Sequence, residues 1–384
     1  MSDPMSATTA EREIARLRSE AQGLGGGGRT PTEVVERLLA LQAQDLAAAK
    51  WAVATRAGGS TEQDIDGALA RGEIIRSWPM RGTLHLVPAR DLGWMLELTT
   101  SRLLAQASAR HRQLELDGAA FEQAREIAIE ALWGGRELSR AGFMQLLESH
   151  GMATKNQRGY HIIWVLAQTG TLCWGRVENG SQTLVLLDEW APEQRRLERD
   201  ESLGEFLRRY VRGHGPATLQ DFVWWSKLTM ADAKIGLAVA RADLQEYLVD
   251  GTSYWISAET DASAPSTAGR RRFAASLRAL PAFDEYFLGY QRREAVIDER
   301  WADRIVPGRN GVFQPIVVAG GRVVGTWRRA MNGGSVSVEA FPFAPLSAVQ
   351  TAGFEREARR YARFLGKKLV EGATAKHPLS VAGE

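Results

Sequence analysis

Hydrophobic positions near the start of the chain change from helical to strand spacing. After Thr30 and Pro31, which are typical of a helix cap and a first helical turn, apolar residues recur at three- and four-residue intervals up to Leu41. A second helix is expected after Thr61, because Asp64 stands three residues later as in a capping box. Residues 74–78 and 83–87 then have the character of strands. Two helices followed by two strands predict an irregular winged-helix unit.

The same order recurs twice, each time with three helices before the pair of strands. The second copy has predicted helices over 121–132, 139–149 and 154–167, and strands over 172–177 and 183–187. The third copy has helices over 202–211, 219–226 and 229–239, and strands over 244–249 and 252–256. Asn179-Gly180 and Asp250-Gly251 are typical of the tight turns that join paired strands. Recurrence of one pattern predicts tandem structural units.

The remainder of the chain is mixed in character. Residues 257–269 are rich in Ala, Ser, Thr and Pro and predict a flexible linker, followed at once by Arg270-Arg271-Arg272. This triplet is either a solvated surface run or an edge that contacts phosphates. Strands over 315–318 and 322–329 flank Ala319-Gly320-Gly321, which predicts a β-hairpin. A last helix is expected over 348–369, and its polar side carries Arg356, Arg359, Arg360 and Arg363.

These elements predict an α+β fold of three tandem winged-helix units and a C-terminal mixed α/β region with a β-hairpin. The expected boundaries are a loose N-terminal tail over 1–29, winged-helix units over 30–118, 119–198 and 199–257, a linker with the basic triplet over 258–272, and the C-terminal region over 273–384.

Composition restricts the class of protein. The chain has 384 residues, of which 44% are apolar and 24% charged, as in ordinary globular proteins. Its single cysteine, Cys173, lies in an apolar run and is expected to be a buried strand residue, so no disulfide within the chain is possible. No apolar run approaches the roughly 18 residues of a membrane span, and the N-terminus has no secretory signal. A cytoplasmic protein without membrane association is expected.

Charge allows nucleic-acid binding without requiring it. The formal net charge is only +2, yet seven of the 48 basic residues are lysines, so 41 are arginines. The guanidinium group is well suited to phosphates and base edges, although a genomic preference for arginine codons explains the same count. The six histidines show no ligand spacing, and no phosphate-binding loop is present in the sequence, so neither a metal nor another cofactor is expected.

One polar position stands out on the first predicted helix. Gln42 falls near the middle of the apolar face that Val35 and Leu38 define. It is either a core glutamine with backbone partners or a polar group presented to a cavity. Gln44 cannot share this helical face, because residues two apart point in different directions. If both glutamines serve one site, the helix must end before them, and an extended or turning segment must bring them to one side.

Three segments resemble a known family. Residues 41–45 (Leu-Gln-Ala-Gln-Asp), 77–85 (Ser-Trp-Pro-Met-Arg-Gly-Thr-Leu-His) and 281–286 (Pro-Ala-Phe-Asp-Glu-Tyr) together look like the bacterial winged-helix DNA glycosylases of the AlkZ/YcaQ type, over about residues 31–369. The Gln-apolar-Gln form resembles the AlkZ branch, associated with self-resistance in producers of crosslinking antibiotics such as azinomycin. The YcaQ branch has Asp in place of Gln44. The resemblance implies a C-shaped molecule that excises N7-alkylated purines and unhooks interstrand crosslinks in double-stranded DNA.

The resemblance also assigns residues. It implies that Gln42 and Gln44 are catalytic, and that a basic hairpin which probes the duplex corresponds to Gly320, Gly321 and Arg322. Arg81 and His85 are weaker candidates for DNA contact, since His85 is equally explained as a strand histidine bonded to nearby backbone. Asp45 is an alternative carboxylate or a helix cap, and Trp78 could stack on a base or belong to the core.

Three functions remain open at this point. The first is a monofunctional, monomeric DNA glycosylase that needs no metal. The second is a non-catalytic winged-helix regulator that binds DNA, and the third is a winged-helix module for protein contacts. The pair of glutamines in an apolar segment favours the enzyme, and no ligand-sensing or dimerisation domain that would favour a regulator is evident.

Overall fold

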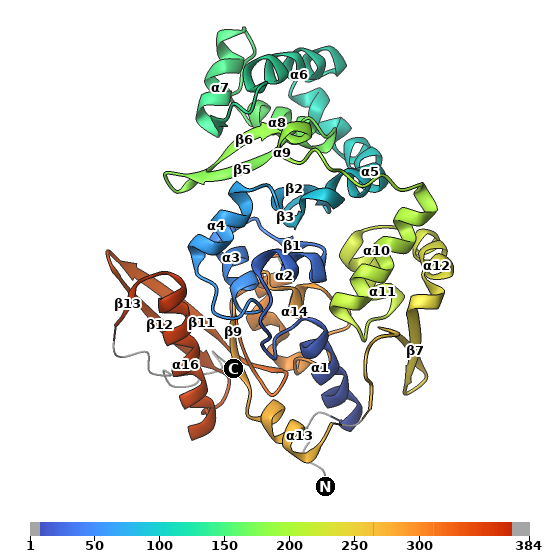
Figure 1. The fold of residues 1–384 in the computed structure, drawn as a ribbon, viewed down its shortest axis with the longest axis vertical. Helices are drawn as coiled ribbons and strands as arrows, with labels where there is room; N and C mark the ends of the chain where they lie inside the picture. The colour runs from blue at the N-terminus through green and yellow to red at the C-terminus, as the bar shows by residue number, and fades with distance from the viewer. Residues whose placement is uncertain (1–7, 264, 310, 371–384) are drawn as a thin grey trace.

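The computed structural model describes residues 8–263, 265–309 and 311–370, and it confirms a mixed α+β fold (Figure 1). The first structural unit, here unit 1, has the order helix, short strand, helix, helix, strand, strand. Its elements are α2 (Pro31–Leu38), β1 (Leu41–Gln42), α3 (Leu46–Ala54), α4 (Glu62–Ala70), β2 (Ile74–Met80) and β3 (Thr83–Pro88). The short strand β1 pairs antiparallel with the last strand, β3. This is the order of a winged helix.

Units 2 and 3 repeat that order. Unit 2 contains α6 (Gly118–Leu132), β4 (Leu138–Ser139), α7 (Arg140–Ser149), α8 (Arg158–Gln168), β5 (Leu172–Glu178) and β6 (Ser181–Leu186), and β4 pairs with β6. Unit 3 contains α10 (Arg199–His214), α11 (Leu219–Ser226), α12 (Met230–Val239), β7 (Leu244–Val249) and β8 (Thr252–Ser257). Here the short strand is reduced to a single bridge between Ala217 and Trp255. The sequence pattern missed this short strand in all three units, because one or two residues carry no periodicity.

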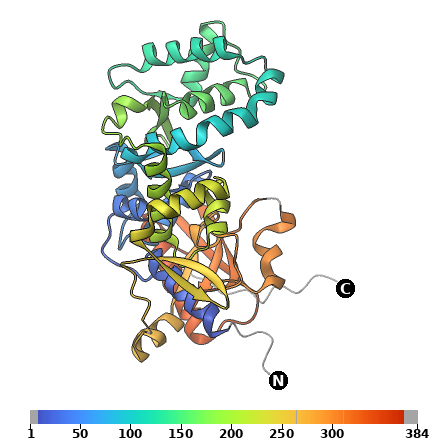
Figure 2. The same ribbon diagram turned by 90° about the vertical axis from the view of Figure 1, so that its right-hand side faces the viewer.

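Units 1 and 2 share one sheet. Its strand order is β1-β3-β2-β5-β6-β4, and the two units meet where Arg76 of β2 pairs with Trp174 of β5. The long helix α5 (Leu92–Gln113) connects unit 1 to unit 2, and the short helix α9 (Leu187–Trp190) follows β6 on the way to unit 3. Strands β7 and β8 of unit 3 form a separate two-stranded sheet, which faces the viewer in Figure 2.

The C-terminal region is a five-stranded sheet with one long helix. Its strand order is β13-β12-β11-β10-β9, and the strands are β9 (Leu277–Leu280), β10 (Ile316–Ala319), β11 (Arg322–Asn332), β12 (Ser335–Pro342) and β13 (Lys368–Leu369). Its helices are α13 (Thr267–Ala274), α14 (Glu285–Leu288), α15 (Ala302–Ile305) and α16 (Ala348–Phe364). Short 3₁₀ turns lie at Ala89–Asp91, Arg241–Asp243, Glu299–Trp301 and Pro307–Arg309.

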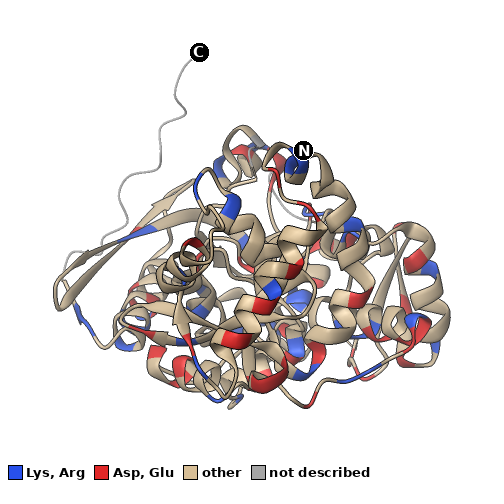
Figure 3. Cartoon of the chain, turned by 90° about the horizontal axis from the view of Figure 1, so that it is seen from above, with Lys and Arg blue, Asp and Glu red and all other residues tan. Residues whose placement is uncertain are grey.

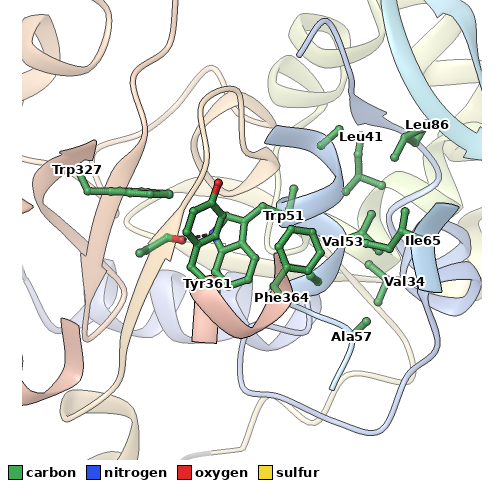
Figure 4. Close-up of a cluster of buried hydrophobic side chains, with 14 of the residues drawn as sticks. Val34, Leu41, Trp51, Val53, Ala57, Ile65, Leu86, Trp327, Tyr361 and Phe364 are labelled. Atoms are coloured by element: carbon green, nitrogen blue, oxygen red, sulfur yellow. Dashed lines mark hydrogen bonds between the residues drawn. The ribbon is translucent and has the colours of Figure 1, made fainter. Parts of the chain in front are cut away.

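Unit 1 and the C-terminal region share one hydrophobic core. Trp51 of α3 packs edge-on against Tyr361 of α16, with ring centroids 4.9 Å apart, and also contacts Phe364 (Figure 4). Its indole Nε1 donates to the carbonyl of Ala279 in β9 at 2.8 Å. Trp327 of β11 closes the same cluster. This core fixes α3 of unit 1 against α16.

Unit 1 occupies the centre of the molecule in Figure 1. The helices of unit 2 lie at one end of the long axis, α13 lies at the other, and unit 3 packs beside unit 1. The C-shaped outline implied by the family resemblance stays a prediction. Among the described residues, no helix combines the length and the apolar character needed to cross a membrane. Acidic and basic residues are interspersed along the described part of the chain, in keeping with the small net charge (Figure 3).

Three of the predicted boundaries are wrong. The expected loose tail over 1–29 contains helix α1 (Thr9–Ala21), which begins with a Thr8–Glu11 capping box and buries Arg18 against the backbone of Pro216 and Arg292. The expected linker over 258–272 includes the start of α13, so the arginine triplet is helical. The last helix ends at Phe364 rather than 369, because Gly366 adopts a φ of 62° and the chain turns into β13. Residues 1–7 and 371–384 lie outside the described part.

Candidate functional site

The Gln-Ala-Gln segment lies on an extended stretch and not on a helix. Helix α2 ends at Leu38, and Leu39 takes a φ of 65°, which breaks the helical path. Gln42 then pairs with His85 of β3, and the Ala43 N–H donates to the Leu84 carbonyl at 2.7 Å. The helical position predicted for Gln42 is therefore wrong. The helix ends before both glutamines, as a shared site requires, with Gln42 in β1 and Gln44 in the bend that precedes α3.

Gln42 is held at both its backbone and its side chain. Its Oε1 accepts a hydrogen bond from the Arg81 guanidinium at 3.0 Å, and its backbone N–H donates to Glu285 Oε1 at 3.2 Å. Gln42 is partly buried. Because arginine has only donors, this contact fixes which end of the amide is oxygen.

The Gln44 side chain is exposed, but its amide oxygen is also held by a hydrogen bond. Its Oε1 accepts from the backbone N–H of Leu84 at 2.8 Å. A backbone N–H is also a donor only, so the amide oxygen faces β3 and the Nε2 group points away from it. Gln44 therefore keeps a defined orientation despite its exposure.

Arg81 and His85 both belong to this site. Arg81 and Gly82 form the two-residue turn between β2 and β3, both with positive φ. The Arg81 guanidinium lies 2.7 Å from His85 Nε2, while His85 Nδ1 lies 2.8 Å from the Thr83 carbonyl. His85 is fully buried, and burial together with the Arg81 charge lowers its pKa to about 3. The histidine is thus neutral, with its proton on Nδ1 and its Nε2 as acceptor for Arg81.

Glu285 is a buried carboxylate directly behind Gln42. Its Oε2 accepts from Trp225 Nε1 at 2.8 Å and lies 3.4 Å from His214 Nε2, while its Oε1 accepts from the backbone of Gln42. Burial by itself would raise the pKa of Glu285, but the hydrogen bond from His214 and the nearby charge of Arg81 leave it lowered. The carboxylate is therefore ionised and joins the C-terminal region, unit 3 and the glutamine segment.

The preceding residue, Asp284, forms a second buried ion pair. Both of its carboxylate oxygens lie 2.8 Å from the guanidinium of Arg56, which follows helix α3. Arg56 also donates to Gln22 near the end of α1. The two side chains are 1% and 0% exposed, so the pair is closed to solvent. Asp284 also caps α14 through the N–H of Tyr286.

Asp45 and Trp78 have structural roles. The Asp45 side chain accepts from the N–H of Ala48 and caps α3, which was one of its two predicted roles. Trp78 is 2% exposed and belongs to the core around unit 2. Cys173 is also buried, as expected for a strand cysteine, and burial raises the pKa of its thiol.

A hollow of about 310 Å³ opens beside Arg81. Helix α5 forms one wall, and residues 226–228, which link α11 to α12, form the other. Arg102 donates to the backbone carbonyl of Lys227, so the two walls are tied together. Arg81, Arg102 and Lys227 make this hollow basic.

The predicted hairpin Gly320-Gly321-Arg322 is a turn that packs inward. The Gly321 carbonyl accepts from the buried Tyr286 hydroxyl at 2.7 Å, and a Cβ on Gly321 would lie 3.0 Å from Ala15 of α1. Arg322 donates to the carbonyls of Glu294 and Ala295. These contacts contradict a role for this turn in probing a duplex. The open turn is at the other end of β11, where Gly333 and Gly334 join β11 to β12 (Figure 1).

The structure brings together the glutamines, Arg81 and His85 that the sequence singled out, but His85 is buried and bonded to the Thr83 carbonyl, which was the alternative to DNA contact. The sequence did not indicate the residues that support them. Glu285 was quoted only as part of a motif, and Arg56 and His214 were not considered for the site. No local signal could place His214, since it lies 71 residues from Glu285 along the chain. An acidic pair inside the apolar stretch 279–290 is the one available hint.

The chain is similar to known DNA glycosylases. The chain is 26% identical over 354 residues to an interstrand DNA cross-link repair glycosylase of Streptomyces sahachiroi, covering 87% of this chain and 91% of that protein. The structure of the Streptomyces sahachiroi DNA glycosylase AlkZ superposes with a TM-score of 0.74 at 23% identity, over 95% of this chain and 100% of the other, which shows that the fold is shared. The family described as DNA glycosylase AlkZ-like matches residues 35–364. The match spans unit 1, its glutamine segment and the supporting acids, and the chain belongs to the AlkZ-like DNA glycosylase family.

Proposed function

We propose that this protein hydrolyses the N-glycosidic bond of N7-alkylated purines in double-stranded DNA, including purines joined in an interstrand crosslink. In this proposal it acts as a monomer and a monofunctional glycosylase, with Gln42 and Gln44 as the catalytic residues. The observation that carries the proposal is that both amide oxygens are fixed by hydrogen bonds. Each Oε1 is held by a donor-only group, the Arg81 guanidinium for Gln42 and the Leu84 N–H for Gln44.

The fixed amide oxygens suit the orientation of a water molecule. An amide oxygen has two lone pairs, and each of these contacts uses one. In the proposed arrangement, the remaining lone pair of each amide oxygen receives one of the two protons of a single water. The lone pair of that water then points away from the protein toward the sugar. A water that is already held in this geometry loses less translational and rotational entropy when it reacts, which lowers the barrier.

This chemistry needs no general base, which glutamine cannot supply. An N7-alkylated guanine is already cationic, so the C1′–N9 bond breaks with its electron pair moving to the base, which leaves neutral. The water oxygen bonds to C1′ of the oxocarbenium-like sugar, and the released proton passes to solvent. The buried negative charge of Glu285, behind Gln42, offsets the positive charge of Arg81 beside the Gln42 amide, so that the Arg81 charge opposes the developing positive charge at the sugar less.

The exposure of Gln44 is compatible with a tethered lesion. A base bonded to both strands cannot be rotated fully into a deep, closed pocket. Gln44 is exposed on the segment between β1 and α3, where a duplex can approach it. This supports the inclusion of crosslinks among the substrates.

Base release from a defined duplex tests the proposal. The substrates are a duplex with a single N7-methylguanine and one with a nitrogen-mustard crosslink. The wild type should release the base from both, and Gln44→Ala and Gln42→Ala should each lower the rate by about 10²–10³-fold, the usual effect of removing one preorganised polar contact. Gln63→Ala, on the exposed face of α4, is the matched control and should keep the wild-type rate.

Two results would contradict the proposal. Absence of release by the wild type from both duplexes would refute the assigned substrates. An undiminished rate in Gln44→Ala, with unfolding curves equal to those of the wild type, would remove this residue from the catalytic pair.

A further inference from the structure

Helix α16 presents four arginines toward one hollow. Arg356, Arg359, Arg360 and Arg363 stand at positions i, i+3, i+4 and i+7, which share one helical face. With Trp51, Phe364 and the loop Gly59–Thr61 they line a hollow of about 350 Å³. We refer to these four side chains as the α16 arginine face.

Acidic side chains do not balance this charge. None lines the hollow. Within the described residues, Arg356 and Arg363 have no carboxylate within 4.0 Å, and Arg359 reaches only Glu355 at 3.9 Å. Arg360 is the anchored member, since it donates to the Ala54 carbonyl at 2.7 Å, lies 3.7 Å from Glu357 Oε1, and has its guanidinium 5.6 Å from the Trp51 ring. Three arginine side chains thus remain available to an anion.

The arginine face lies close to the glutamine segment. Helix α3 begins after Asp45, directly behind Gln44, and Trp51 is six residues further along, or about 9 Å at the helical rise of 1.5 Å per residue. Tyr361, on the same turn of α16, packs against Trp51 of α3. Its hydroxyl accepts from Arg329 of β11, and burial together with the charges of Glu62 and Asp45 raises its pKa to about 12 despite Arg329.

We propose that the α16 arginine face binds phosphates of the DNA strand a few nucleotides from the lesion at Gln42 and Gln44. Phosphates on one strand follow each other every 3.4 Å along the duplex axis, so several of them lie within the span of one arginine-bearing helical face. Arginine forks match phosphate oxygens in two-point contacts. The inference rests on the proposed action on DNA and extends it to a backbone site outside the catalytic segment.

The second arginine cluster of the chain supplies the control. Arg270, Arg271 and Arg272 on α13 are exposed consecutive residues and point in different directions, so they cannot converge on one phosphate. The test compares Arg356→Gln/Arg359→Gln/Arg363→Gln with Arg270→Gln/Arg271→Gln/Arg272→Gln. Both triple variants lose three positive charges.

The measurement is binding of an undamaged fluorescent duplex at several salt concentrations. The α16 variant should bind at least about tenfold more weakly at 0.1 M salt, and the slope of log K against log salt should fall by about 2.7, which is about 0.9 for each of the three lost phosphate contacts. The α13 variant should keep the wild-type slope. The single variant Arg363→Gln, expected to lose about 0.9 of the slope, serves if the triple variant fails to fold.

The outcomes separate this inference from the proposed function. Wild-type slopes in both α16 variants would overturn the arginine face as a DNA site, whatever the base-release assay gives. Equal losses in the α16 and α13 triple variants would also overturn it, since they would show an effect of net charge alone. Failure of the wild type to release N7-methylguanine would instead refute the proposed reaction.

Discussion

The C-terminal region meets unit 1 with two charged segments of opposite character. Asp284 and Glu285 are buried, and each has a partner from elsewhere in the fold, Arg56 for the first and His214 with Trp225 for the second. The α16 arginine face is open, has one sign of charge and has few carboxylates near it. Both segments lie within reach of helix α3, yet they differ in what their charge can do.

The difference separates charges that support the fold from charges that can bind a ligand. Buried paired charges cannot exchange partners without the cost of desolvated ions, so they fix the positions of the backbone and side chains around them. Exposed like charges contribute little to the folded state and interact through their counterions, so they act on a charged ligand. The acidic pair is therefore expected to control stability, and the arginine face to control salt-dependent DNA binding.

The largest expected effect is on the buried pair. Asp284→Ala leaves the Arg56 guanidinium buried without its carboxylate, and the free energy of unfolding should fall by about 3–5 kcal/mol. Urea unfolding followed by circular dichroism measures this. The control Glu294→Ala removes an exposed carboxylate 3.9 Å from Arg292 and should change stability by less than about 0.5 kcal/mol. Similar losses in both variants would break the distinction between buried and exposed charge.

An intermediate effect is expected from pH. The pKa of His85 is lowered to about 3 in the folded protein by burial and by the Arg81 charge, with Glu285 opposing them, while an unfolded histidine titrates near 6.5. Between these values the unfolded chain binds a proton that the folded chain does not. Stability should therefore decrease as pH falls from 6.5 toward 3, by at most about 1.4 kcal/mol per pH unit from this residue.

Two variants isolate the contribution of His85. Urea unfolding from pH 7 to pH 4.5 should show a shallower decline in His85→Gln than in the wild type. The exposed His150→Gln should follow the wild-type curve. If His85→Gln also follows that curve, His85 is not held neutral in the folded state.

The smallest expected effect is on the stability of variants in the α16 arginine face. Arg359→Gln and Arg363→Gln remove exposed charges from α16, and each should change the free energy of unfolding by less than about 0.5 kcal/mol. The same urea titration measures this. A loss of 2 kcal/mol or more would show that the arginine face is part of the folded scaffold rather than a surface kept for a ligand.

Local patterns allowed much of the fold to be predicted. Capping residues such as Thr30, Thr61, Thr218 and Thr229 start the helices that follow them, since a cap acts on backbone groups two or three residues away. The hairpin at Asp250-Gly251 was also predictable, because these two turn residues tolerate the positive φ that a tight turn requires. Strand β1 was missed because it is two residues long and depends on its pairing with β3, which no helical or strand period records.

The candidate site was predictable only in part. The glutamines, Arg81 and His85 stand in short segments that resemble the family, so they could be named from the sequence. The acids behind them could not be paired, because Arg56 is 228 residues from Asp284 and His214 is 71 residues from Glu285. The arginines of α16 were visible as a polar face, but the surface opposite them became evident only from the packing of Trp51 and the Gly59–Thr61 loop.

Arg76 links the two units that share the six-stranded sheet. It is the residue of unit 1 that pairs with Trp174 of unit 2, and its guanidinium donates to Gln182 of unit 2 and to the carbonyls of Ala43 and Gln44. The Arg76 side chain thus contacts both unit 2 and the glutamine segment of unit 1. These hydrogen bonds tie the position of Gln44 to that of unit 2.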